Sequence, residues 1–253
     1  MPINYLRGLT SLQRTETSNR RLGCALAFVA GAANAGGFIA IGQYTSHMSG
    51  IVSSVADNAV LGRTALVFQA FGAVLAFAGG AATSAILINW GRQRCFQSVY
   101  AIPLVIEALV LLFFGLLGPD LLRHEFVYLP LTVALLCYVM GLQNAMITKI
   151  SKAEIRTTHV TGLITDIGIE LGRALYWNGD MLATDARFVR ANRPKVILLT
   201  SLLLMFVAGG FFGAATFERL GFLATVPIAF VLLLCAFVPL LDDIAVIGKQ
   251  RKD

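Results

Sequence analysis

Apolar residues run along the chain in six stretches of about 20 residues, each with few charges. A helix needs roughly 20 apolar residues to cross ~30 Å of hydrocarbon, so each stretch predicts one transmembrane helix. The predicted spans are 22–42, 66–89, 99–118, 128–148, 196–217 and 220–241. Segments 45–62 and 157–172 also have helical patterns, but they are shorter and more polar. The pattern predicts an all-α, polytopic membrane protein with one membrane domain over 1–253.

Composition narrows the classes that this pattern allows. Hydrophobic residues make up 57% of the chain, charged residues only 13%, and the mean hydropathy is +0.75. A soluble domain carries about 25% charged residues. This chain has too few charges to cover a water-facing surface, which excludes a soluble enzyme, a disordered chain and a conventional nucleic-acid binder. We therefore expect the lipid bilayer as a partner and no nucleic acid.

The distribution of positive charge predicts the orientation. With six spans and an inner N-terminus, 17 of the 20 Lys and Arg residues fall on the inner side, and Arg63, Arg123 and Arg219 fall outside. Lys and Arg collect in cytoplasmic loops, so both termini are predicted to be cytoplasmic. A seventh span at 45–62 would weaken this bias.

The chain also contains an internal repeat, because residues 31–63 resemble residues 141–173. The matched pairs are Gly31 with Gly141, Asn34 with Asn144, Thr45 with Thr157, His47 with His159 and Gly50 with Gly162. Weaker matches follow between 78–80 and 208–210, and between Pro103 and Pro227. They predict two halves, about 1–120 and 121–253, each with three spans and one short helix.

The two predicted halves are inverted, since the first span runs outward and its counterpart, the fourth, runs inward. Inverted repeats with interrupted hydrophobic segments at corresponding positions are typical of secondary transporters, and the interruptions point to the binding site. Here the interruptions are 43–62 and 149–173.

Two motif pairs within the repeat connect the chain with a known family. NAGGF is followed by TSHMSG near the first span, and GLQNA is followed by TTHVTG in the second half. With these motifs the chain resembles the YoaK-like (DUF1275-type) family of bacterial integral membrane proteins without an assigned function. The resemblance covers nearly the whole chain and implies a plasma-membrane (inner-membrane) protein. It supplies no substrate, cofactor or catalytic residue.

Each short helix is predicted to carry a polar stripe that begins with a histidine. Offsets of 3, 7 and 11 from His47 or His159 reach polar or small residues, which are Gly50, Ser54 and Asn58, and Gly162, Asp166 and Glu170. Hydroxyl residues before each stripe are good helix caps. Two helix starts at one midplane site would favour an anionic or strongly hydrogen-bonding solute, although nearby acidic residues leave a cation open. Alternatively both helices are interfacial, with the histidines on opposite surfaces roughly 30 Å apart.

The candidate residues form two groups. The predicted solute-binding residues are Asn34, Thr45, His47, Ser49, Gly50, Asn144, Thr157, His159, Thr161 and Gly162. The predicted proton- or ion-coupling residues are Asp57, Glu107, Asp166 and Glu170. Glu107 lies within an apolar span, where a carboxylate is functional by default. Each group has a structural alternative: the histidines satisfied by nearby hydroxyls, the asparagines as glue between helices, and the short-helix carboxylates as solvated charges.

These residues predict a small secondary transporter, with proton coupling as an option, for an unidentified small solute. One alternative is a membrane-embedded enzyme that uses a histidine and a carboxylate, and another is a structural or regulatory membrane protein without transport. HExxH and other metal or catalytic motifs are absent from the sequence. We therefore expect no enzyme, no catalytic residue, no metal and no cofactor, and the oligomeric state stays open.

Overall fold

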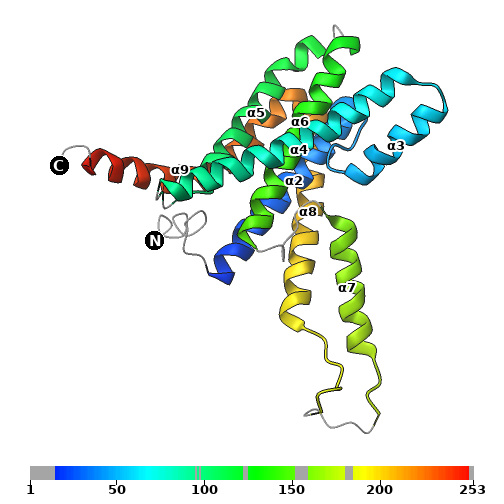
Figure 1. Ribbon diagram of the computed structural model, residues 1–253, viewed down its shortest axis with the longest axis vertical. Helices are drawn as coiled ribbons and strands as arrows, with labels where there is room; N and C mark the ends of the chain where they lie inside the picture. The colour runs from blue at the N-terminus through cyan, green and yellow to red at the C-terminus, as the bar shows by residue number, and fades with distance from the viewer. Residues whose placement is uncertain are drawn as a thin grey trace.

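The computed structural model describes residues 15–94, 96, 98–121, 125–151, 159–179 and 185–250, and these residues form helices and connecting turns without a strand. In chain order the helices are α2 (Glu16–Ile41), α3 (Met48–Val60), α4 (Thr64–Gln93), α5 (Ala101–Leu121), α6 (Glu125–Ile150), α7 (Val160–Leu175), α8 (Arg193–Leu220), the 3-10 turn η1 (Gly221–Ala224) and α9 (Thr225–Gln250). The all-α prediction is confirmed for this part of the chain (Figure 1).

Five stretches of the described chain are long and apolar enough to cross a membrane. The fifth, Arg193–Phe237, contains α8, η1 and the first part of α9, so it includes two of the predicted spans. A multi-pass membrane protein is therefore supported, while the count of six spans stays a prediction. The short helices α3 and α7, with 13 and 16 residues, are separate from these five stretches.

Local sequence signals set several helix ends. Thr15 caps α2, because its hydroxyl accepts a hydrogen bond from the backbone N–H of Ser18. Gly42 ends α2 with a φ of 71°, a left-handed conformation that glycine adopts without strain. The side chain of Asn192 caps α8 in the same way as Thr15 caps α2, by accepting from Lys195 N–H. The two N-caps fit the starts of α2 and α8, which lie six and three residues before the predicted starts, whereas α2 ends one residue before its predicted end.

The long helices pair across the two halves of the sequence. The most extensive contacts join α2 with α8, α4 with α6 and α5 with α9. Each pair takes one helix from residues 1–121 and one from residues 125–250, so the halves are interleaved rather than side by side. The short helices pack within their own halves, α3 on α4 and α7 on α8.

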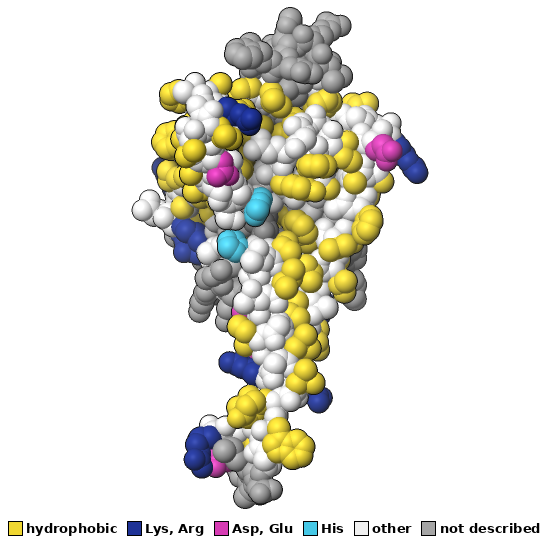
Figure 2. Space-filling model, turned by 90° about the vertical axis from the view of Figure 1, so that its right-hand side faces the viewer, with side chains coloured by type: hydrophobic (Ala, Val, Ile, Leu, Met, Phe, Trp, Pro, Cys, Tyr) yellow, Lys and Arg dark blue, Asp and Glu magenta, His cyan; other side chains and the backbone are white. Residues whose placement is uncertain are grey.

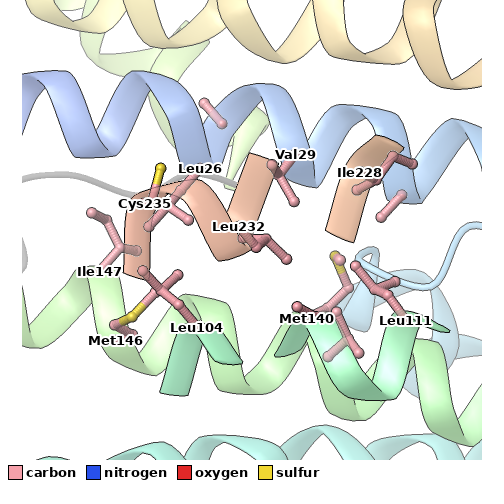
Figure 3. Packing of buried hydrophobic residues seen from close by; sticks show 14 of the residues in the cluster. Leu26, Val29, Leu104, Leu111, Met140, Met146, Ile147, Ile228, Leu232 and Cys235 are labelled. Atoms are coloured by element: carbon pink, nitrogen blue, oxygen red, sulfur yellow. The ribbon is translucent and has the colours of Figure 1, made fainter. Parts of the chain in front are cut away.

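Buried apolar side chains fill the space between α2, α5, α6 and α9 (Figure 3). Leu26 and Val29 of α2 face this core, and Leu232 of α9 lies between α2 and the α5–α6 pair. A smaller cluster lies under α3, where Ile51 is buried against α4 and α6. This second cluster fixes the position of α3 relative to the long helices.

Helix α7 and the first part of α8 extend together from the main body as an arm (Figure 1). Reciprocal hydrogen bonds between Asn178 and Val189 join the two sides of the connection between them. Asp185 accepts from the side chain and backbone N–H of Arg187, which lowers the pKa of its carboxyl. The described part of segment 174–195, called the 174–195 loop below, belongs to this arm and carries Arg187, Arg190 and Arg193.

Candidate functional site

A cavity of about 380 Å³ lies where the two short helices begin. Its wall combines polar and apolar residues from both halves of the chain. They are Asn34, Tyr44, Ser46, His47, Met48, Ser49, Phe77, Asn144, His159, Val160, Thr161 and Phe206. Figure 2 shows the two described histidines close together on one face of the molecule. The structure thus places both on the wall of one cavity, as expected if the two segments converge.

Most lining positions occur in matched pairs. His47, Met48 and Ser49 at the start of α3 correspond to His159, Val160 and Thr161 at the start of α7. Asn34 of α2 and Asn144 of α6 form another such pair. The cavity is therefore built from the same kinds of side chain by each half.

Each histidine is the N-cap residue of its short helix. His47 has φ and ψ of −89° and 69°, His159 has −87° and 60°, and neither side chain caps its own helix. Sequence reasoning expected the hydroxyl residues to cap these helices, which is wrong at the cap position itself. In the first half the reason is visible, because the Ser46 hydroxyl donates instead to the side-chain oxygen of Asn34, at 2.8 Å.

Asn34 fixes the segment that leads into α3. Its side-chain oxygen accepts from both the hydroxyl and the backbone N–H of Ser46, the latter at 3.3 Å. Thr45 is fully buried next to it, and its carbonyl accepts from the Cys137 thiol of α6 at 3.4 Å. Asn34 therefore both lines the cavity and positions His47, whereas Thr45 only supports the segment from behind.

The glycine three residues after each histidine adjoins the imidazole ring. A Cβ atom at Gly50 would lie 2.6 Å from Nδ1 of His47, too close for any real contact. A Cβ atom at Gly162 would lie 3.7 Å from Nδ1 of His159, an ordinary van der Waals distance. The shared glycine is thus required by the ring position in the first half and only compatible with it in the second.

The predicted solute-binding residues divide into three groups. Asn34, His47, Ser49, Asn144, His159 and Thr161 line the cavity. Thr45, Gly50 and Gly162 support the wall without lining it. Thr157 lies outside the described residues.

Sequence reasoning missed the aromatic part of the wall. Phe77 of α4 and Phe206 of α8 line the cavity together with Tyr44, whose ring stacks on Phe38 at 4.5 Å. Phe77 and Phe206 each come three residues before a glycine, Gly80 and Gly209. Because Phe is common in membrane helices, this spacing gave no signal until the glycine contacts were known.

None of the predicted coupling residues lines the cavity. Asp57 is exposed on α3, and Asp166 lies 3.6 Å from the Lys195 ammonium. Glu170 is buried and uses both carboxylate oxygens, one for Arg173 at 2.9 Å and one for the backbone N–H of Asn192 at 2.7 Å. Its contacts join α7 to the start of α8.

Glu107 lies in the core of the molecule instead. It is fully buried in α5, and neither carboxylate oxygen has a hydrogen-bond partner among the described residues. Gln143 of α6 is buried as well, with its amide N–H donating to the Leu26 carbonyl at 3.1 Å and its side-chain oxygen unpartnered within the described chain.

These two residues lie at similar depth in the core. In Figure 3, Leu104 lies beside Met146 and Leu111 beside Met140, so α5 and α6 run antiparallel. Glu107 and Gln143 are each midway between these contacts along their helices. An ionised carboxylate without a partner at this depth would be costly.

Glycines bring the cross-half helix pairs into backbone contact. A Cβ atom at Gly31 of α2 would meet the carbonyl of Phe206, and one at Gly141 of α6 would meet the carbonyl of Phe77. In the same way Gly80 faces the Tyr138 carbonyl, and Gly209 faces the Phe28 carbonyl.

These contacts correct the weaker sequence match. They pair Gly80 with Gly209, one residue away from the alignment of 78–80 with 208–210. Gly80 and Gly209 are therefore positions of close helix packing, while a Cβ at Gly79 would meet nothing within 4 Å.

A family model described as "Protein of unknown function (DUF1275)" matches residues 22–238 of the chain. The chain belongs to the DUF1275 family. The match includes α3, α7 and every residue of the cavity wall, so the site lies within the part that defines a DUF1275 protein. Searches of curated proteins and of solved structures gave no match.

Proposed function

We propose that this DUF1275 protein is a small secondary transporter whose solute binds in the cavity between α3 and α7. One observation carries the proposal: His47 and His159, 112 residues apart, line the same cavity from corresponding positions of the two halves. Two interfacial helices on opposite membrane surfaces would separate the histidines by roughly 30 Å. A shared cavity favours convergence of the two segments.

Matched helix contacts support an inverted repeat as the framework of this transporter. Exchange of the two halves turns the α2–α8 contact into α6–α4, and turns α5–α9 into itself. The glycine contacts follow the same exchange, because Gly31 on Phe206 becomes Gly141 on Phe77. In this arrangement the α2–α8 pair and the α4–α6 pair can rock against each other around a central site. Many transporters alternate access in this way.

Proton coupling is assigned to Glu107 in this proposal. It is the predicted coupling residue whose carboxylate is buried without a partner among the described residues. Asp166 and Glu170, in contrast, have cationic partners. Glu107 would be neutral when α5 and α6 pack as observed and would ionise when water reaches the core.

The proposal also includes an orientation and a location. Both termini and the 174–195 loop face the cytoplasm of a bacterial cell, with the protein in the inner membrane. Cysteines introduced at positions 10, 180 and 250 should resist impermeant thiol reagents added outside intact cells. Labelling of position 180 from outside would contradict the inverted orientation of the second half.

Uptake into vesicles tests the transport function directly. The full chain is reconstituted, and accumulation of labelled carboxylates, amino acids, sugars and amines is measured with and without a proton gradient. We expect uptake of one solute class that His47→Ala and His159→Ala each reduce at least tenfold. Ser53→Ala and Thr165→Ala, in exposed positions of α3 and α7 away from the cavity wall, are the matched controls.

Three results would contradict the proposal, the first of them only its choice of site. If both histidine variants insert normally and keep full uptake, the cavity is not the transport site. If only one histidine matters, and only for product formation in detergent, the membrane-embedded enzyme is the better explanation. If the wild-type protein shows neither uptake nor product formation, a structural or regulatory membrane protein is the better explanation.

A further inference from the structure

We propose that the solute held in this cavity is a small organic carboxylate with a short apolar chain. This inference rests on the proposed transport site and names its substrate class. It follows from the charge of the wall, the two helix starts, the aromatic residues and the volume, all of which belong to the same described cavity.

The charge of the wall favours an anion over a cation. Among the described residues that line the cavity, none is Asp or Glu, and the two histidines are the side chains that can carry a positive charge. Asp166 and Glu170 lie seven and eleven residues beyond His159, or roughly 10 and 16 Å along an α-helix. Both carboxylates also face cationic partners there. Asp166 and Glu170, which had made a cationic solute an alternative, therefore do not reach the cavity.

Backbone groups add to this preference. The first residues of α3 and α7 lie on the wall, so both helices present their N-terminal ends to the same cavity. The first N–H groups of a helix lack partners within the helix and carry a partial positive charge. The Met48 N–H of α3 already donates to the Ser46 carbonyl at 3.1 Å, and neither histidine side chain caps the other N–H groups of its helix start. A carboxylate between the two starts would receive hydrogen bonds from both halves.

The apolar part of the wall favours a solute with an apolar group. Phe77 and Phe206 line the cavity from α4 and α8, and Met48 and Val160 add aliphatic surface. An inorganic anion would leave this surface in contact with water. The volume of about 380 Å³ is near the lower end for small-molecule sites, which limits the solute to a short chain.

Binding to the purified full-length protein tests the substrate class without depending on transport. Butyrate, 1-butanol and butylammonium each have four carbon atoms and differ in charge, and in butyrate one of the four is the carboxylate carbon. We expect saturable binding of butyrate, with shifts in the NMR signals of two of the three histidines, and neither response to the other two probes. Affinity should rise about fourfold per methylene from acetate to hexanoate, because each buried CH₂ adds a constant increment.

Variants and a lipid-like probe locate the site. His47→Gln and His159→Gln should each weaken butyrate binding about tenfold, while Ser53→Ala and Thr165→Ala leave it unchanged. If oleate competes with butyrate and hexanoate does not, the ligand is a membrane fatty acid rather than a water-soluble carboxylate, and the inference is overturned. Inorganic phosphate binding as tightly as butyrate would overturn the apolar requirement.

The outcomes separate this inference from the transport proposal. Saturable butylammonium binding without butyrate binding would overturn the anionic substrate and leave a transport site in place. Vesicle uptake of a non-carboxylate solute, with no butyrate binding, would do the same. Butyrate binding that shifts the histidine signals, without uptake of any carboxylate into vesicles, would support the anion site and reject transport.

Discussion

Helices α3 and α7 are alike at their starts, which line the cavity, and differ at their C-terminal ends, which lie away from it. Both begin directly after a histidine with nearly the same backbone angles. At its C-terminal end, α3 is joined to α4 by a turn of three residues, in which Gly62 has a φ of 69°. Helix α7 is instead followed by a long connection to α8, and the buried Glu170 joins the two helices.

The difference shows what the repeat preserves. The cavity wall needs a histidine, a small or hydroxyl residue and a helix start in each half, because both halves contact the same space. The outer ends of the short helices contact different surroundings and are free to diverge. A tight turn fixes α3, whereas charged contacts fix α7, so we expect α7 to be the more easily displaced of the two.

The largest expected effect tests whether the α2–α8 crossing and the α6–α4 crossing are equivalent. Gly31→Ala and Gly141→Ala place a methyl group against the backbone of the partner helix. Overpacking of this kind should lower the free energy of unfolding by roughly 3 kcal/mol in each case. Unfolding of the purified protein by denaturant in detergent measures this free energy.

Gly79→Ala is the control for this pair, since a Cβ at Gly79 meets nothing within 4 Å. It should be neutral or raise stability by up to about 1 kcal/mol through helix propensity. A large effect at Gly31 with none at Gly141 would break the equivalence of the two crossings.

The second prediction concerns the different attachment of the short helices. Glu170→Gln removes the charge that binds Arg173 and the backbone N–H of Asn192. This variant should lower the free energy of unfolding by about 2 kcal/mol, a typical contribution of a hydrogen bond to a charged group. Asn58→Ala changes the corresponding position of α3, where the side chain donates to the Ser54 carbonyl of the same helix. The free energy of unfolding of that variant should stay within about 0.5 kcal/mol of the wild-type value. Equal losses of stability in the two variants would show that both helices are held in the same way.

The third prediction uses a difference between α5 and α9, because Glu107 of α5 corresponds to Val231 of α9. Glu107→Gln should reduce uptake driven by a proton gradient about tenfold, or ~1.4 kcal/mol, because the variant cannot release a proton. Exchange of solute across the vesicle membrane without a gradient should continue. Val231→Ala, at the matching position of α9 by the Pro103–Pro227 alignment, should leave coupling intact. Unchanged gradient-driven uptake in Glu107→Gln would reduce Glu107 to a packing role.

The smallest effect separates the two glycines beside the histidines. Gly50→Ala should displace the His47 ring and weaken solute binding about threefold, whereas Gly162→Ala should change it less than 1.5-fold, because the ring of His159 is farther from the added methyl group. Titration of each variant with butyrate measures the difference. Equal weakening by both would mean that the histidines are seated identically.

The sequence by itself determined the helices and the matched asparagine and histidine pairs of the site. Long apolar runs have one low-energy solution in a bilayer, because every backbone polar group must bond within its own helix. The repeat of Asn34 and His47 as Asn144 and His159 identified residues that line one cavity.

Only the tertiary structure decided which of the predicted polar residues share that cavity. Asp166 and Glu170 follow the same helical stripe as His159, yet their partners lie on and before α8, which sequence spacing does not reveal. Phe77 and Phe206 reach the wall because glycines allow their helices to cross at backbone contact with the opposite half. Spacing along one helix sets which side chains share a face, but packing between helices sets what that face meets.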